Sequence, residues 1–159
     1  MNTPTIDNAG VRFPPPLLSV LAILAGWLLD RQWPLPIASQ GRSATQLALG
    51  WIVILAAFAL AFWAISTFRR WKTAVIPRKP ATRIVQDGPF AYSRNPMYVG
   101  MTMLTVGVGV LLNTWWVLAM TPVALTVLYL KVVRREEAYL ASTFPDDYRA
   151  YCARVRRWF

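Results

Sequence analysis

Residues that could do chemistry gather first in a basic, proline-rich segment of the C-terminal half. From Lys72 to Tyr98 the sequence reads KTAVIPRKPATRIVQDGPFAYSRNPMY, whose four prolines predict a structured loop rather than a helix. Exposed donors from Arg83 and Arg94, with a turn at Asp87, would suit an anionic or phosphate-bearing ligand. On composition alone, a basic loop that only fixes membrane topology is the favoured interpretation.

A second group of charged residues, Arg134, Arg135, Glu136 and Glu137, directly follows a long apolar stretch. Neighbouring residues point ~100° apart on an α-helix, so only one arginine and one glutamate can face the same site. A carboxylate there could bind ribose hydroxyls or an ammonium group, and an arginine could hold a carboxylate or phosphate through two hydrogen bonds. A solvated charge cluster at a membrane interface is the alternative.

The composition narrows the chemistry further. The chain has no histidine, which excludes imidazole bases, haem ligation by histidine and most zinc sites. Cys152 is the only cysteine, so an intramolecular disulfide or a cysteine metal cluster cannot form, and no metal site is predicted. A net charge of +10 would fit nucleic acid or an anionic membrane, but 56% hydrophobic residues favour the membrane and argue against nucleic acid.

Three uncharged stretches could supply membrane spans of ~20 residues: 13–29, 43–68 and 95–130. The last would measure ~54 Å as one helix, too long for a single crossing, and Asn113 with Thr114 offers a turn near its middle. Four transmembrane helices are therefore predicted, over 13–33, 45–68, 96–112 and 114–131. A cleaved signal peptide is the alternative for the first, although no convincing cleavage site follows it.

The basic residues predict the orientation. Seven lie in 69–94 and seven follow Leu130, whereas one precedes the first span and two lie between the first and second. Because cytoplasmic loops collect Lys and Arg, the 69–95 loop and the 132–159 tail should be cytoplasmic. We expect a multi-pass protein of a bacterial inner membrane whose active site faces the cytoplasm.

The tail is predicted to be helical. Lys131 to Ser142 continues the fourth span, and a further helix starts near Pro145, with Thr143 and Asp146 as a capping box. Its aromatic face would lie on the membrane surface or pack beneath the bundle. The prediction for 1–159 is thus a single all-α integral membrane domain of about four spans plus a cytoplasmic C-terminal amphipathic helix.

Two segments, RKPATRIVQDGPFAYSRNPMYVG at 78–100 and REEAYLASTFPDDYRAYCARVRRW at 135–158, together resemble the isoprenylcysteine carboxyl methyltransferases and the related phospholipid methyltransferases. The first matches the family's Gly-Pro-aromatic and Arg-His/Asn-Pro-x-Tyr-x-Gly patterns. The second matches its Glu-Glu and Phe-x-x-x-Tyr-x-x-Tyr patterns. The resemblance covers the C-terminal half, and the first two spans carry no family signature.

The resemblance implies a membrane methyltransferase in which both segments close around S-adenosylmethionine on the cytoplasmic side, while a lipophilic or lipidated acceptor enters from the bilayer lipids. Carried over by position, the cofactor-binding residues would be Arg83, Ile84, Val85, Phe90, Asn95, Pro96, Met97, Tyr98 and Glu136. Asn95 stands where the eukaryotic enzymes have a histidine. Arg135, with Arg134 as substitute, would orient an acceptor carboxylate.

Other functions stay open at this point. Within the same family, the acceptor could be a phospholipid amine instead of a carboxylate. A membrane reductase using a nicotinamide cofactor is a further possibility, because sterol reductases resemble this C-terminal architecture. A non-catalytic membrane subunit or small transporter is disfavoured, since residues 43–68 and 95–130 contain no charged side chain for an ion pathway.

Overall fold

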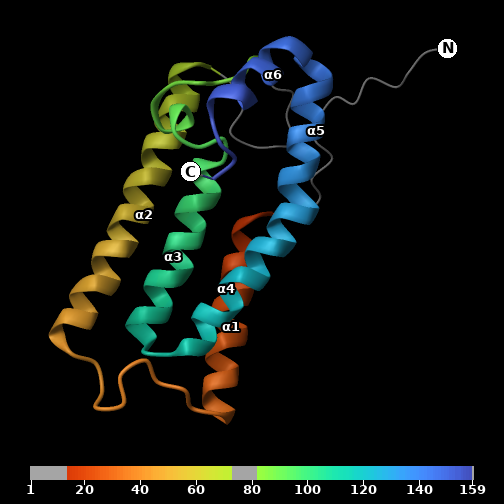
Figure 1. Ribbon diagram of the computed structural model, residues 1–159. Coiled ribbons are helices and arrows are strands. Elements are labelled where there is room, and N and C mark those ends of the chain that lie inside the picture. Colours follow the sequence, from red (N-terminus) through yellow and green to blue (C-terminus); the bar gives the residue numbers. More distant parts are fainter. Residues whose placement is uncertain (1–13, 73–81, 159) are drawn as a thin grey trace.

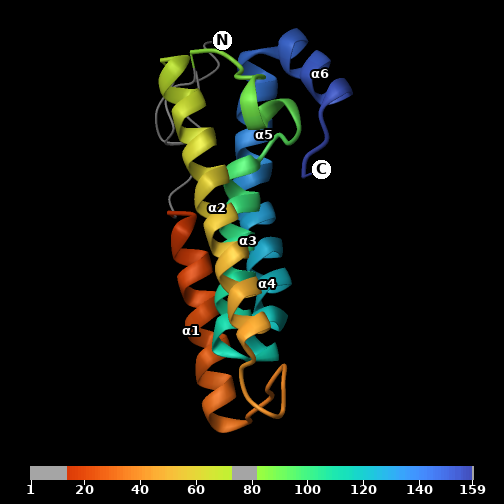
Figure 2. The same ribbon diagram turned by 90° about the vertical axis from the view of Figure 1, so that its left-hand side faces the viewer.

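Four long helices form the body of the protein. The computed structural model describes residues 14–72 and 82–158, and in it α1 (Pro16–Gln32), α2 (Ala44–Arg70), α3 (Pro96–Leu112) and α4 (Trp115–Leu128) run side by side (Figures 1 and 2). Helix α2 packs mainly on α3, and α1 packs on α4 and α3. The predicted span of 96–112 matches α3, and the other three differ from their helices by a few residues.

The two ends of this bundle are built differently. At one end lie residues 33–43 and the turn between α3 and α4, which we call the loop end (Figure 1, bottom). At the other end, the α6 end, α4 continues through a π-helical turn, η2 (Tyr129–Val133), into α5 (Arg134–Thr143). The 3-10 turn η1 (Gly88–Ala91) and α6 (Pro145–Arg154) also lie there (Figure 1, top).

The helix boundaries follow local signals in the sequence. Ser43 accepts a hydrogen bond from the backbone of Gln46 and caps α2, and proline occupies the first turn of α1, α3 and α6. Asn113 ends α3 in the left-handed conformation with φ 60°, and Thr114 caps α4, so the predicted hairpin is confirmed.

The predicted capping box at the start of α6 is wrong. Thr143 belongs to the end of α5, and the N-cap position is Phe144, which has no side-chain cap. The helix nevertheless begins at Pro145 as expected, because the fixed φ of proline suits the first position of a helix.

Glycines allow the helices to approach closely. A Cβ at Gly26 of α1 would lie 2.6 Å from the Cα of Val117 in α4. A Cβ at Gly107 of α3 would lie 2.7 Å from the side chain of Ile54 and 3.1 Å from the carbonyl oxygen of Gly50, both in α2. Such close contacts between small residues stabilise helix pairs where lipid, not water, is the competing solvent.

Two helices are long and apolar enough to cross a membrane: Ala44–Arg70 and the continuous helix Trp115–Thr143. Only 22% and 28% of their most apolar windows are buried inside the protein, whereas the core helix of a soluble protein would be mostly buried. These two helices are therefore typical of a membrane protein. In the second of these helices the charged residues begin at Lys131, so the apolar part ends there. Helix α3 is also apolar but has 17 residues.

Candidate functional site

The loop before α3 is packed against the end of α2. Apolar side chains from both segments form one cluster, made of Ala64, Phe68, Trp71, Val85, Phe90 and Met97. The rings of Phe68 and Phe90 lie 4.7 Å apart between centroids. Gly88 has φ +59°, and a Cβ there would lie 2.7 Å from the Thr67 hydroxyl oxygen. The loop thus has a fixed path, set by buried apolar contacts and one glycine.

Neighbouring residues of this loop contact different parts of the protein. The Arg83 guanidinium lies over the Trp71 ring, 5.2 Å from its centroid. Ile84 packs against the buried Tyr148 and Tyr151 of α6, and the Tyr151 hydroxyl donates a hydrogen bond of 2.7 Å to the carbonyl oxygen of Phe90. The aromatic face of α6 is therefore used for packing beneath the bundle.

Helices α3 and α5 meet through Tyr98 and Glu136. The Tyr98 hydroxyl donates a hydrogen bond of 2.6 Å to Oε1 of Glu136. Glu136 lies beyond the apolar part of its helix, where burial raises the pKa of its carboxyl group to about 7, against the opposing effect of the bond from Tyr98. At neutral pH, both the acid and the carboxylate form of this group are therefore populated.

The π-helical turn η2 sets which side of α5 faces the loop. A π-helix bonds residue i to i+5 and turns less per residue than an α-helix. The five π-helical residues of η2 therefore change the directions in which the side chains of α5 point about the helix axis. In this register Glu136 faces α3 and Glu137 faces the loop and the C-terminal segment. Both glutamates are consequently engaged, with different partners.

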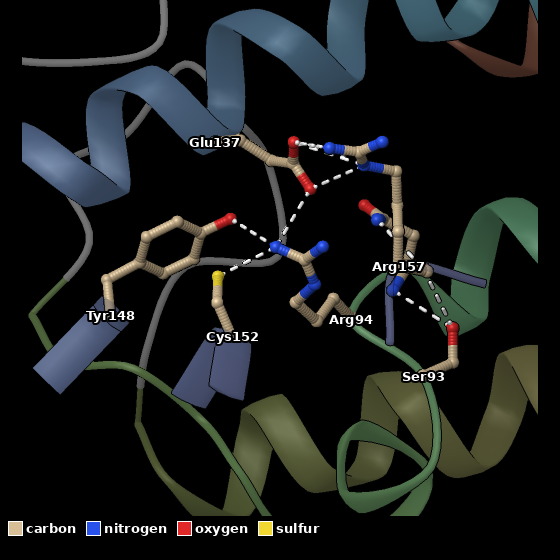
Figure 3. A network of polar contacts seen from close by, with 7 residues as sticks. Ser93, Arg94, Glu137, Tyr148, Cys152 and Arg157 are labelled. Atoms are coloured by element: carbon tan, nitrogen blue, oxygen red, sulfur yellow. Dashed lines mark hydrogen bonds and ion pairs between the residues drawn. The ribbon is translucent and has the colours of Figure 1, made fainter. Parts of the chain in front are cut away.

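Glu137 is the centre of a charged network (Figure 3). Arg157 holds its carboxylate through two nitrogens, with Nε 2.9 Å from Oε1 and Nη2 2.9 Å from Oε2. Arg94 Nη1 lies 3.3 Å from Oε1. Only 14% of the Arg94 side chain and 17% of the Glu137 side chain are exposed, so these charges are partly removed from water. The hydrogen bond to Glu137 raises the pKa of Arg157.

Arg94 also reaches α6, where its Nη1 donates to the Cys152 sulfur at 2.7 Å and to the Tyr148 hydroxyl at 3.4 Å. The expectation that Arg94 is an exposed donor is therefore wrong. The guanidinium is drawn inward because three polar groups from α5 and α6 surround it, and this arrangement links the loop to both helices of the tail.

The segment 155–158, after α6, lies across the residues that precede α3. The Arg94 amide donates to the Arg156 carbonyl at 3.0 Å. The Ser93 hydroxyl and the Asn95 side-chain amide both donate to the Arg157 carbonyl, at 3.3 and 3.2 Å. Asn95 is thus buried and directed toward the C-terminal segment.

The sequence-predicted residues are partly brought together. Tyr98 contacts Glu136, and Val85, Phe90 and Met97 share one cluster, as described above. Pro96 is buried at the start of α3. Arg134 and Arg135 are exposed on α5. Arg134 precedes Glu136 by two residues, or about 200° around the helix, so these two point to nearly opposite sides.

Glu137 and Arg157 were not among the predicted site residues. Both lie in the 135–158 segment that resembles the methyltransferases, and Glu137 is half of its Glu-Glu pair. That pair was the available signal. The sequence could not say which glutamate meets an arginine, because the partners are 20 and 43 residues away.

Comparison with known families gives one match. The family model of the phospholipid methyltransferases matches residues 45–147, which is more than half of the chain. The matched range runs from the start of α2 to the start of α6 and includes both Tyr98 and Glu136. No solved structure matches the chain.

Three curated proteins are similar to parts of the chain. The cobalt-zinc-cadmium resistance protein CzcN of Cupriavidus metallidurans is 30% identical over 57% of this chain and 42% of its own length. The nickel-cobalt-cadmium resistance protein NccN of Alcaligenes xylosoxydans xylosoxydans is 32% identical over 50% of this chain and 38% of its own. The protein-S-isoprenylcysteine O-methyltransferase of Schizosaccharomyces pombe is 35% identical over 45% of this chain and 30% of its own. The chain thus spans less than half the length of each of these relatives.

Proposed function

Because this chain belongs to the phospholipid methyltransferase family, we propose that it transfers a methyl group from S-adenosylmethionine to a lipophilic acceptor in the membrane. One observation carries this proposal: the two segments that resemble the methyltransferases meet at the α6 end, through Tyr98 with Glu136 and through Arg94 with Glu137. The acidic and cationic groups of a ligand site are thereby concentrated where the apolar part of the helices ends.

The residues at this end fit the cofactor chemically. S-adenosylmethionine carries a sulfonium and an ammonium group, which a carboxylate such as that of Glu136 would attract, and a carboxylate and ring nitrogens that accept hydrogen bonds. Within the described ranges, the Trp71 indole nitrogen and the Arg94 Nε are buried donors without a partner. Buried donors of this kind are costly unless a ligand or water accepts from them.

We place the cofactor against the loop and α5. The residues proposed to hold it are Arg83, Ile84, Val85, Phe90, Asn95, Pro96, Met97, Tyr98 and Glu136. When bound, it supplies a methyl group already activated by the sulfonium. The protein then has to align the acceptor with that methyl group and exclude water, tasks that need no histidine. In this scheme Tyr98 orients Glu136 through their hydrogen bond.

For the acceptor, a carboxylate is our first choice. The similarity to the protein-S-isoprenylcysteine O-methyltransferase of Schizosaccharomyces pombe supports esterification of a prenylated cysteine. Arg135, with Arg134 as substitute, would orient such a carboxylate from the exposed side of α5. Membership of the phospholipid methyltransferase family supports the second candidate, N-methylation of a phospholipid amine.

We further propose that α1, α2, α3 and α4 all cross the bilayer, with the α6 end in the cytoplasm of a bacterium and the acceptor entering from the inner membrane. The two apolar helices and the exposed apolar side chains along the bundle support this arrangement. So does the charge distribution along the sequence, since 14 of the 17 basic residues lie in 69–94 or after Leu130.

Titration of the detergent-purified protein tests the cofactor directly. Calorimetry should detect binding of S-adenosylmethionine and none of a reduced nicotinamide cofactor. Binding of the nicotinamide alone would replace the proposal with a membrane reductase. Binding of neither would indicate a non-catalytic subunit.

Methyl transfer to prenylcysteine analogues and to aminophospholipids, measured in parallel with a radiolabelled methyl donor, tests the acceptor. If Arg135 orients a carboxylate, Arg135→Lys should lower methyl transfer to prenylcysteine while S-adenosylmethionine still binds, because lysine keeps the charge but loses the bidentate geometry. Methylation of the phospholipid alone, with Arg135→Lys fully active, would show that the acceptor is an amine.

A further inference from the structure

Helix α2 presents a stripe of large apolar side chains away from the rest of the protein. Trp51, Leu55, Phe58 and Phe62 follow one another at spacings of four, three and four residues, which places them on one face of the helix. All four are exposed, Phe62 to 73%. Helix α3 covers a different face of α2, where Ile54 and Ala57 are buried.

The same face ends in positive charge. Arg69 lies seven residues after Phe62, so it continues the stripe about two turns further on, and Arg70 adjoins it. Both arginines are exposed at the end of α2, and neither forms an ion pair with another described residue. They are therefore available to an external anion.

The distances along α2 match those of a lipid leaflet. Arg69 lies ~10 Å beyond Phe62 along the helix axis, at ~1.5 Å per residue. The headgroup layer on each side of a bilayer is ~5–8 Å thick, so a hydrocarbon-facing Phe62 brings Arg69 to the level of the phosphates. As a whole, the 27 residues of α2 extend for ~40 Å, which is close to a bilayer with its headgroups.

We propose that this face of α2 binds an anionic phospholipid of the surrounding bilayer, with an acyl chain along Leu55, Phe58 and Phe62 and the phosphate at Arg69 and Arg70. The charge complementarity selects an anionic over a zwitterionic headgroup. This inference is independent of the proposed methyl transfer, because it uses none of the residues assigned to the cofactor or the acceptor.

A second copy of the chain fits this face less well. In a dimer with a two-fold axis along the membrane normal, both copies would contribute the same patch, and the two pairs of arginines would face each other at the headgroup level. Like charges at short distance oppose such pairing. An anionic lipid instead neutralises them.

Native mass spectrometry of the detergent-purified full chain tests the proposal. The probes are phosphatidylglycerol and phosphatidylcholine with identical acyl chains, together with soluble glycerol phosphate. We expect phosphatidylglycerol to be retained preferentially and glycerol phosphate not to bind, because the apolar stripe supplies part of the affinity. Each arginine removed should lower the preference about fivefold, so Arg69→Gln with Arg70→Gln should lower it on the order of 25-fold.

Two further variants separate the contributions of charge and apolar contact. Arg149→Gln removes an exposed cation of α6 and should leave the preference unchanged. Phe62→Ala should weaken binding of both phospholipids about equally. Equal retention of the two phospholipids by the wild type, or an unchanged preference in the double arginine variant, would overturn the proposal. A dimer that Phe62→Ala dissociates, without any change in lipid retention, would assign the face to a second copy.

Discussion

At the loop end, polar side chains form hydrogen bonds mostly with backbone groups, whereas at the α6 end charged side chains form ion pairs with one another. Asn113 accepts hydrogen bonds of 2.9 Å from the Ala38 amide and the Gln46 side chain, and donates one of 3.1 Å to the Ala38 carbonyl. Asp30 accepts from the Thr114 hydroxyl at 2.8 Å and from a loop amide at 3.1 Å. The α6 end instead carries the partly buried Arg94, Glu137 and Arg157 (Figure 3).

This difference indicates that the two ends of the bundle have different roles. Bonds at the loop end satisfy backbone groups and fix residues 33–43 over the α3–α4 turn, which is a structural task. Removing charges from water costs free energy, which offsets most of the attraction between them, so partly buried ion pairs add little net stability. Such charges commonly mark ligand sites. This contrast supports the ligand site proposed at the α6 end, and five experiments test it.

The largest expected effect is all-or-none labelling of the two ends. In a Cys152→Ser background, a cysteine at the exposed Gln40 should react with an impermeant thiol reagent only from outside the cell, and one at the exposed Arg154 only from the cytoplasm. Labelling of both positions from the same side would contradict the proposed topology.

The next effect concerns the charged network. Glu137→Gln leaves Arg94 and Arg157 without their shared anion, so the free energy of unfolding should fall by about 3 kcal/mol. Thermal unfolding in detergent measures the change. Asp146→Asn is the matched control, because it removes an exposed ion pair with Arg149 and should have no measurable effect. Equal stability of the two variants would mean that the network is not structural.

Glu136→Gln should weaken S-adenosylmethionine binding by on the order of ten- to a hundredfold, since a charge-assisted hydrogen bond is lost. With a pKa of about 7, the wild-type carboxyl group ionises across neutrality, so affinity for the cationic cofactor should rise as pH increases through 7. The variant should show no such rise. Titration calorimetry at several pH values measures both. Wild-type affinity in both Glu136→Gln and Asn95→Ala would disprove the assigned site.

The same raised pKa affects stability. Because the pKa rises from 4.5 in the unfolded chain to about 7 in the fold, the folded state binds more protons between these values, and stability should fall as pH rises from 4.5 to 7. Glu136→Gln should remove this slope, which pH-dependent thermal unfolding would detect.

The smallest effect is expected at the loop end. Asn113→Gly keeps the left-handed conformation but removes the side-chain hydrogen bonds, so it should lower stability by about 1–2 kcal/mol. Asn113→Ala should cost more, because alanine is also strained at positive φ. Methyl transfer by the folded protein should be unchanged in both. A variant that remained folded but lost activity would show that the loop end contributes to the site.

Local signals in the sequence determined the helical layout. Pro96 and Asn113 fix the start and end of α3, so its predicted range is correct, and the hairpin follows from the same asparagine. The residues of α6 that share one face, including Tyr148 and Tyr151, follow from helical spacing alone. Such features depend on residues within a few positions of one another, and for that reason the sequence predicts them.

The tertiary structure decided which charges meet. From the sequence alone, Glu136 and Glu137 are equivalent neighbours. The π-helical turn before them, which no local sequence signal predicted, directs Glu136 to Tyr98 and Glu137 to Arg94 and Arg157. The burial of Arg94 likewise requires α5 and α6 to close over the loop. These contacts join residues 20 to 58 positions apart, and their geometry depends on how whole helices pack rather than on the residues beside them.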